Sequence, residues 1–117
     1  MPQILTSDAA IESREGLTGI VLRTLEAYDT IHVHTNHSDY DLLLLDPESG
    51  RVLVRGGRRF VEPVEATVNG SAFGGCLLVS GWLGVGMRME VDADGQSILT
   101  SPVQSLRVTH PDIKREA

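Results

Sequence analysis

From residue 30 onward, hydrophobic and polar residues alternate or form short apolar runs between turn residues, a pattern typical of β-strands. The turn sequences are DPESG, GG, NG and DADG, in which glycine supplies backbone conformations that other residues resist. Pro102 must interrupt the last strand or lie at an edge, because it has no N–H to donate. Strands are predicted at 30–35, 40–45, 51–55, 62–68, 75–79, 84–91 and 97–108.

This order of elements predicts a mainly β fold, a single small antiparallel β-barrel or rolled meander sheet of six to seven strands. The alternation also predicts which side chains face the interior. The candidate core positions are Ile31, Val33, Leu42, Leu44, Val52, Val54, Val68, Leu77, Val79, Val85, Met87, Met89, Leu106 and Val108.

In the N-terminal part of the chain, before residue 30, the apolar residues are spaced differently. Apolar residues near helical intervals predict one N-terminal helix at 13–28, although Gly16 and Gly19 each cost a helix up to ~1 kcal/mol. A strand at 19–25 is the alternative. We therefore divide the single domain, residues 1–117, into a helical or irregular segment (1–29), a β-meander (30–108) and a flexible tail (109–117).

Length and charge narrow the class of protein. A chain of 117 residues is the size of one domain, and its net charge of −6 opposes binding to nucleic acid. Cys76 is the single cysteine, so an internal disulfide is excluded. Because the sequence shows neither an apolar span of membrane length nor a secretory signal, we expect a cytoplasmic protein of bacterial type with no membrane contact.

Residues 31–41 read IHVHTNHSDYD and contain most of the chain's histidines. The HVHT and SD within this stretch resemble the first motif of the PHP family of metal-dependent phosphoesterases. The resemblance implies a divalent metal held by His32, His34, His37 and Asp39. Such a metal would activate a water molecule for attack on a phosphate ester.

The rest of the chain departs from that family. Tyr40 stands where the motif has glycine, and a β-hairpin sequence follows where the family has a helix. The simpler interpretation is that Ile31 and Val33 face the core while His32 and His34 face outward. We therefore expect no metal and no cofactor, and keep a phosphoesterase-like hydrolase as the alternative function.

Two other segments are candidate binding sites. RGGRRF resembles a single RGG unit of RNA-binding segments, so Arg58, Arg59 and Phe60 would form the binding face of a nucleic-acid-binding small barrel, our second alternative. Trp82 lies between glycines, and is either a core residue, which we favour, or an exposed anchor for a partner.

No catalytic constellation is visible in the sequence. The serines lack a nucleophile-elbow setting, and Cys76 has no evident base partner. The runs LLLL and CLLV predict a sheet that is apolar on both faces and needs a second cover. We therefore expect a protein that acts through protein–protein contacts, either as a homo-oligomer or with an unidentified protein partner.

Overall fold

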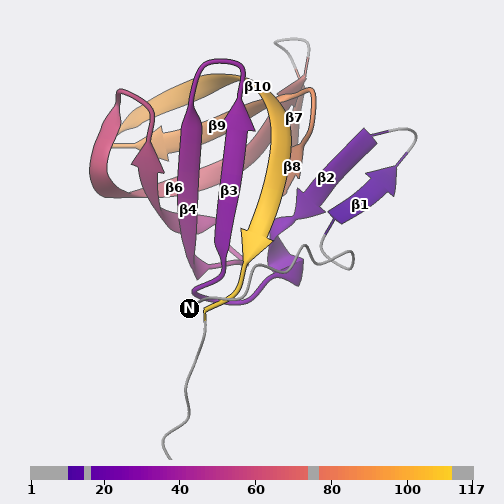
Figure 1. Cartoon of the computed structure of the whole chain (residues 1–117), viewed down its shortest axis with the longest axis horizontal. Helices are drawn as coiled ribbons and strands as arrows, with labels where there is room; N and C mark the ends of the chain where they lie inside the picture. Colours follow the sequence, from indigo (N-terminus) through magenta and orange to yellow (C-terminus); the bar gives the residue numbers. More distant parts are fainter. Residues whose placement is uncertain (1–10, 15–16, 74–76, 112–117) are drawn as a thin grey trace, which may run out of the picture.

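The structure, a computed structural model, describes residues 11–14, 17–73 and 77–111 and is mainly β (Figure 1). No helix in these ranges is long and apolar enough to cross a membrane. The elements are β1 (Ile11–Arg14), β2 (Leu17–Val21), the 3₁₀ turn η1 (Leu22–Thr24), β3 (Thr30–Thr35), β4 (Asp39–Asp46), β5 (Arg51–Gly56), β6 (Phe60–Phe73), β7 (Leu77–Ser80), β8 (Trp82–Gly84), β9 (Arg88–Ala93) and β10 (Gln96–Thr109).

The predicted N-terminal helix is wrong. The segment contains the antiparallel pair β1–β2 and then η1, and β2 continues the small sheet by pairing with β8. Gly19 shows why: a Cβ at this position would lie 2.4 Å from the carbonyl oxygen of Leu83 and from the ring of Trp82. A glycine that disfavours a helix thus permits the close approach of two strands.

Seven antiparallel strands form the main sheet, in the order β5-β4-β3-β10-β9-β6-β7. Strand β5 also pairs with β6, so the six strands from β5 to β6 close into a ring, and β7 extends outward from β6. Figure 1 shows β3 and β4 upright beside β10, with the β1–β2 pair standing next to them. The main sheet is thus rolled, as the sequence predicts.

Strand β6 forms two walls of the ring. Its first half pairs with β5, whereas residues 67–72 pair with β9, and the register shifts between Val68 and Gly70. Gly70 has a φ of +146°, and a Cβ there would lie 2.0 Å from the carbonyl oxygen of Val79. We expected Asn69-Gly70 to end the strand, but the glycine bends it instead and the strand continues to Phe73.

Strand β10 bends in the same way. It pairs with β9 up to Pro102 and with β3 from Val103 onward, with an irregular register between Leu99 and Pro102. Thr100 fills the gap with its side chain, because its Oγ1 accepts the backbone N–H of Met89 at 3.0 Å. The predicted interruption at Pro102 is therefore a bend within one strand.

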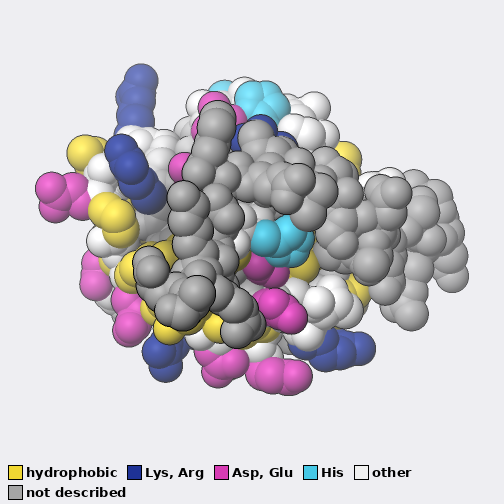
Figure 2. Space-filling model, turned by 60° about the horizontal axis from the view of Figure 1, so that its bottom comes forward, with side chains coloured by type: hydrophobic (Ala, Val, Ile, Leu, Met, Phe, Trp, Pro, Cys, Tyr) yellow, Lys and Arg dark blue, Asp and Glu magenta, His cyan; other side chains and the backbone are white. Residues whose placement is uncertain are grey.

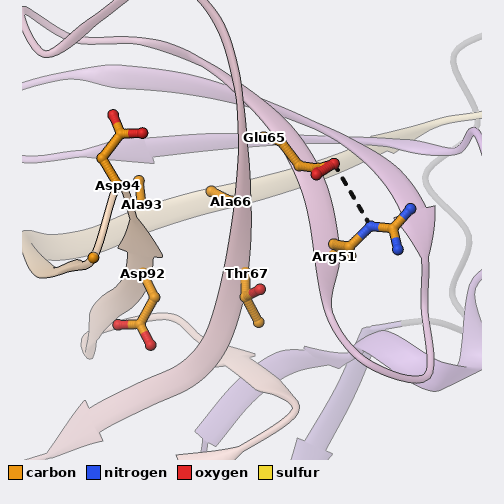
Figure 3. A pocket seen from close by; sticks show the side chains of 8 residues that line it. Arg51, Glu65, Ala66, Thr67, Asp92, Ala93 and Asp94 are labelled. Carbon is orange, nitrogen blue, oxygen red and sulfur yellow. Dashed lines mark ion pairs between the residues drawn. The ribbon is translucent and has the colours of Figure 1, made fainter.

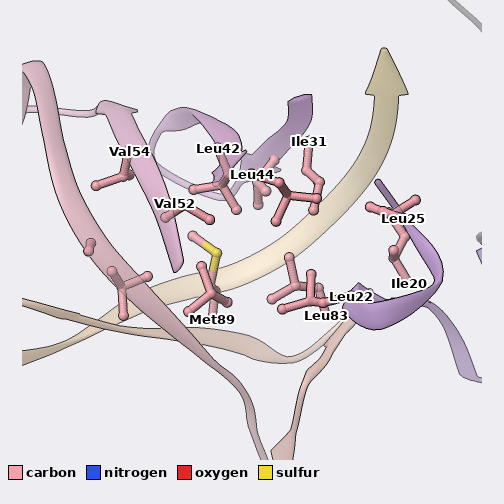
Figure 4. Packing of buried hydrophobic residues seen from close by; sticks show 14 of the residues in the cluster. Ile20, Leu22, Leu25, Ile31, Leu42, Leu44, Val52, Val54, Leu83 and Met89 are labelled. Atoms are coloured by element: carbon pink, nitrogen blue, oxygen red, sulfur yellow. The ribbon is translucent and has the colours of Figure 1, made fainter. Parts of the chain in front are cut away.

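The interior of the ring holds the hydrophobic core, where side chains from opposite walls point toward one another (Figure 4). Ten predicted core residues are buried: Ile31, Val33, Leu42, Leu44, Val52, Val54, Val68, Met87, Met89 and Val108. Val79, Val85 and Leu106 are half-buried. Leu77 is wrong as a core residue, because β7 lies outside the ring and leaves it 59% exposed.

The small sheet β1-β2-β8 and the turn η1 supply core residues that the alternation did not predict, namely Ile20 and Leu83 from the sheet and Leu22 from η1. Ser71 connects this sheet to β6: its buried hydroxyl donates to the carbonyl of Trp82 at 2.8 Å and accepts the N–H of Gly84 at 2.9 Å. The Ser71 side chain thus bonds to backbone groups of β8 that a paired strand would otherwise bond.

The two faces of β4 give a direct test of this arrangement. Leu42→Ala removes a fully buried side chain, so the free energy of unfolding should fall by roughly 2–5 kcal/mol in a urea titration. Leu43→Ala, the matched control on the half-buried outer face, should cost distinctly less. Equal losses for the two variants would contradict the assignment of the inner face.

Candidate functional site

The outer face of β3, β4 and β10 carries a group of polar side chains. On β3 the buried Ile31 and Val33 alternate with His32 and His34, which therefore point outward. In the register of β3 with β4, His32 lies opposite Asp41 and His34 lies opposite Asp39. Each imidazole consequently has a carboxylate directly across the strand pair.

Both cross-strand pairs are hydrogen-bonded. His32 Nδ1 lies 2.7 Å from Asp41 Oδ1, and His34 Nδ1 lies 2.5 Å from Asp39 Oδ1. The His34–Asp39 pair is the more exposed to solvent, because 59% of the His34 side chain is exposed against 27% of the His32 side chain. Exposed pairs of this kind contribute only about 0.2–1 kcal/mol to stability.

His32 has a second partner. Its Nε2 lies 3.0 Å from the hydroxyl of Thr109, which reaches it from β10. Both contacts are satisfied by one tautomer, in which Nδ1–H donates to Asp41 and Nε2 accepts the hydroxyl proton of Thr109. Three neighbouring strands thus contribute one side chain each to a continuous chain of hydrogen bonds.

An open depression of about 600 Å³ lies over this face. Its polar lining comes from the two His–Asp pairs together with Ser105 and Arg107 of β10. Arg107 is exposed and lies directly opposite His32 in the pairing of β10 with β3. The depression is therefore lined by two imidazoles, two carboxylates and one guanidinium group.

The alternative metal site would use His32, His34, His37 and Asp39. In the described ranges, no three His, Cys, Asp or Glu side chains are grouped so that they could hold a metal ion. His37 lies in the turn after β3, where its backbone N–H contacts the hydroxyls of Ser101 and Thr35. The part of the chain that the structure describes thus does not assemble the ligand set that the phosphoesterase hypothesis requires.

A third His–Asp pair was not visible in the sequence. His110 Nδ1 lies 2.7 Å from Asp29 Oδ1, and only 3% of the Asp29 side chain is exposed. The other carboxylate oxygen of Asp29 accepts the backbone N–H of Glu26 at 3.0 Å. This pair ties the end of β10 to the segment before β3, across 81 residues of sequence, and Figure 2 shows histidine among acidic side chains on this end of the molecule.

The predicted binding residues lie in different places. Arg58 and Arg59 are exposed in the turn between β5 and β6, and Arg59 donates to the side chain of Gln96. Phe60 and Trp82 are buried, Phe60 with its ring edge-on to Tyr40 at 6.5 Å. The preference for Trp82 as a core residue is confirmed, and a binding role for the arginines stays a prediction.

Strand β7 presents an apolar surface. Phe73, Leu77 and Leu78 are 53%, 59% and 44% exposed, and they belong to the paired ends of β6 and β7. Natural edge strands are usually protected by charged residues or proline, but the sequence LLVS of β7 contains neither. The apolar sequence of this run indicates a buried strand. The run is exposed because β7 is the last strand of the main sheet.

A smaller cavity of about 200 Å³ lies between β5, β6 and the β9–β10 turn (Figure 3). Arg51 Nε lies 3.9 Å from Glu65 Oε2 on one side, and Asp92 and Asp94 line the other. Hydrogen bonds from Ser97 and Asn69 hold the pKa of Asp92 below the usual aspartate value. The carboxylate is thus fixed in its charged form by neutral donors.

Comparison of the chain with known proteins found no matching family model, no similar curated protein and no similar solved structure.

The lowered pKa of Asp92 leads to a titration experiment. Ser97→Ala removes the hydroxyl that donates to Asp92 Oδ1 at 2.6 Å, so the pKa of Asp92 should rise toward the usual aspartate value. An NMR titration of the Asp92 side-chain carboxyl carbon measures this shift. Because the folded pKa is the lower one, the stability that Asp92 contributes is present above its unfolded pKa and is lost on acidification.

Ser105→Ala removes a serine hydroxyl from the other half of β10, where the strand pairs with β3, and is the matched control that should leave the Asp92 titration unchanged. An unaltered pKa in Ser97→Ala would show that the hydroxyl is not the cause of the shift.

Proposed function

We propose that this chain works through protein–protein contacts and self-associates along strand β7. The observation that carries the proposal is the uncharged, apolar edge that Leu77 and Leu78 present to solvent. An unpaired strand edge offers a row of N–H and C=O groups to another chain. Burial of the flanking leucines would add the hydrophobic contribution to such pairing.

Strand β1, which ends the small sheet on one side, differs from β7. Strand β1, at the edge of the small sheet, has the sequence IESR and so carries a glutamate and an arginine. Charged residues on an edge strand oppose pairing with another chain. The contrast between the two edges favours β7 as the surface for association.

The sequence of β7 suits pairing with a second copy. In an antiparallel pair about a two-fold axis perpendicular to the sheet, residues opposite each other point to the same face. An axis through Leu78 places this leucine opposite its own counterpart and sets Leu77 of one copy against Val79 of the other. The opposed pairs formed by Leu77, Leu78 and Val79 are then aliphatic, and no like charges meet among them.

Substitution of Leu78 tests this arrangement. Leu78→Lys places two like charges opposite each other at the proposed axis, so the dimer dissociation constant should rise by roughly tenfold or more. Sedimentation equilibrium at tens of micromolar protein measures this change.

Leu99→Lys is the matched control, because Leu99 is a leucine of similar exposure (46% against 44%) on β10. The control should associate like the unaltered chain. A strict monomer of the unaltered chain at these concentrations, or an equal loss in both variants, would refute the proposal.

A further inference from the structure

The hydrogen-bonded chain from Thr109 through His32 to Asp41 has a use beyond stabilising the sheet. A hydroxyl on the Nε2 of a histidine whose Nδ1 is held by a carboxylate is the arrangement that activates the serine of a catalytic triad, whatever the order of the residues in the sequence, and threonine offers a hydroxyl of the same kind. We propose that Thr109, His32 and Asp41 form a nucleophilic site that cleaves small, activated carboxylic esters.

The distances meet the geometric requirement for such a site. The contact from Thr109 Oγ1 to His32 Nε2 is 3.0 Å and that from His32 Nδ1 to Asp41 Oδ1 is 2.7 Å, both within hydrogen-bond reach. Each residue comes from a different strand of the continuous order β4-β3-β10, whose ladders fix the backbone positions. The constellation therefore lies on a rigid part of the fold.

The tautomer required for catalysis is the one that the hydrogen bonds select. Asp41 accepts a hydrogen bond from Nδ1–H, which keeps that proton on Nδ1 and leaves the Nε2 lone pair directed at the hydroxyl of Thr109. His32 is half-buried, with 27% of its side chain exposed, so one side of the imidazole is shielded while a substrate can still approach. Asp41 acts as a positioning residue, since it contacts the imidazole and not the reacting atoms.

The reaction follows from these positions. Thr109 Oγ1 attacks the carbonyl carbon of the ester, and its proton passes to His32 Nε2. The tetrahedral intermediate collapses as the bond to the alcohol oxygen breaks, and His32 returns the proton to the leaving alcohol. Water, deprotonated by His32, then cleaves the acyl–Thr109 ester and releases the carboxylic acid, which restores the hydroxyl.

Arg107 suits the charge that develops during this reaction. Its exposed side chain lies opposite His32 and lines the depression of about 600 Å³ together with His32 and Asp41, whereas Thr109 lies beyond the residues that line it. A guanidinium group at this position favours a substrate with a negative oxygen, whether formed at the carbonyl or carried by the acyl group.

The neighbouring pair provides an internal comparison. Ser105, His34 and Asp39 also lie opposite one another across the same three strands. His34 contacts Asp39 as His32 contacts Asp41, but within the described residues no hydrogen bond joins Ser105 to His34. A serine, a histidine and an aspartate two positions along β3 therefore lack the contact that activates the hydroxyl.

The experiment uses the full chain and p-nitrophenyl acetate. Release of p-nitrophenolate measures cleavage, and peptide mass spectrometry locates the acetyl group on the protein. We expect an acetyl adduct on Thr109 of the unaltered chain. Because exposed histidines also cleave this ester, the position of the adduct decides the question together with the rate.

Variants separate a catalytic role from a structural one. Thr109→Val keeps the shape but removes the hydroxyl, and His32→Gln removes the base, so each should abolish the adduct and lower the rate of release by roughly a hundredfold or more. Thr109→Ser should retain both. The matched controls Thr24→Val and His37→Gln change residues that do not line the depression, and they should leave the adduct and its rate of formation unchanged.

Absence of an adduct on Thr109 of the unaltered chain, or release by Thr109→Val at the original rate, would overturn the proposal. Urea titration of each variant shows whether it folds. Should Thr109→Val not fold, the adduct on the unaltered chain and its persistence in Thr109→Ser still decide.

Discussion

The bends in the two longest strands are the constraint on which the rest of the structure depends. Strands β6 and β10 each pair with one neighbour along their first half and with another along their second half. A straight strand cannot serve two walls, so the ring closes only because Gly70 and the irregular stretch around Thr100 turn the chain. Each bend disrupts the ladder locally, and at Thr100 a side-chain hydroxyl replaces the missing backbone partner.

Closure of the ring separates the molecule into an inside and an outside. The inward residues of the strands fill the core, and the outward residues are free to carry chemistry, as His32 and His34 do. Closure also leaves one strand outside, because β7 pairs with the part of β6 beyond the bend. The two surfaces that we propose to be functional, the apolar edge of β7 and the row of His–Asp pairs, are thus both consequences of where the ring closes.

Prediction from the sequence succeeded where a local pattern of apolar residues is compatible with only one structure. The alternation in β3, β4 and β5 placed Ile31, Leu42 and Val52 inside, because a strand with one apolar face can bury only that face. Prediction failed where the same pattern of apolar residues is compatible with two different structures. Residues 13–28 have helical spacing, yet β2 forms because Gly19 allows β8 to approach. Leu77 stands in an apolar run of the sequence like those of the core strands, but β7 lies outside the ring and leaves it exposed.

The sequence by itself determined most of the strands after residue 30, most of the inward positions and the outward direction of the histidines, because these depend on residues close together in the chain. The pairing of distant strands was decided only by the tertiary structure. Thr109 and His32 are 77 residues apart, and Asp29 and His110 are 81 apart. Their contacts depend on the register of β10 against β3, which is set by irregularities within β10 that no local pattern specifies.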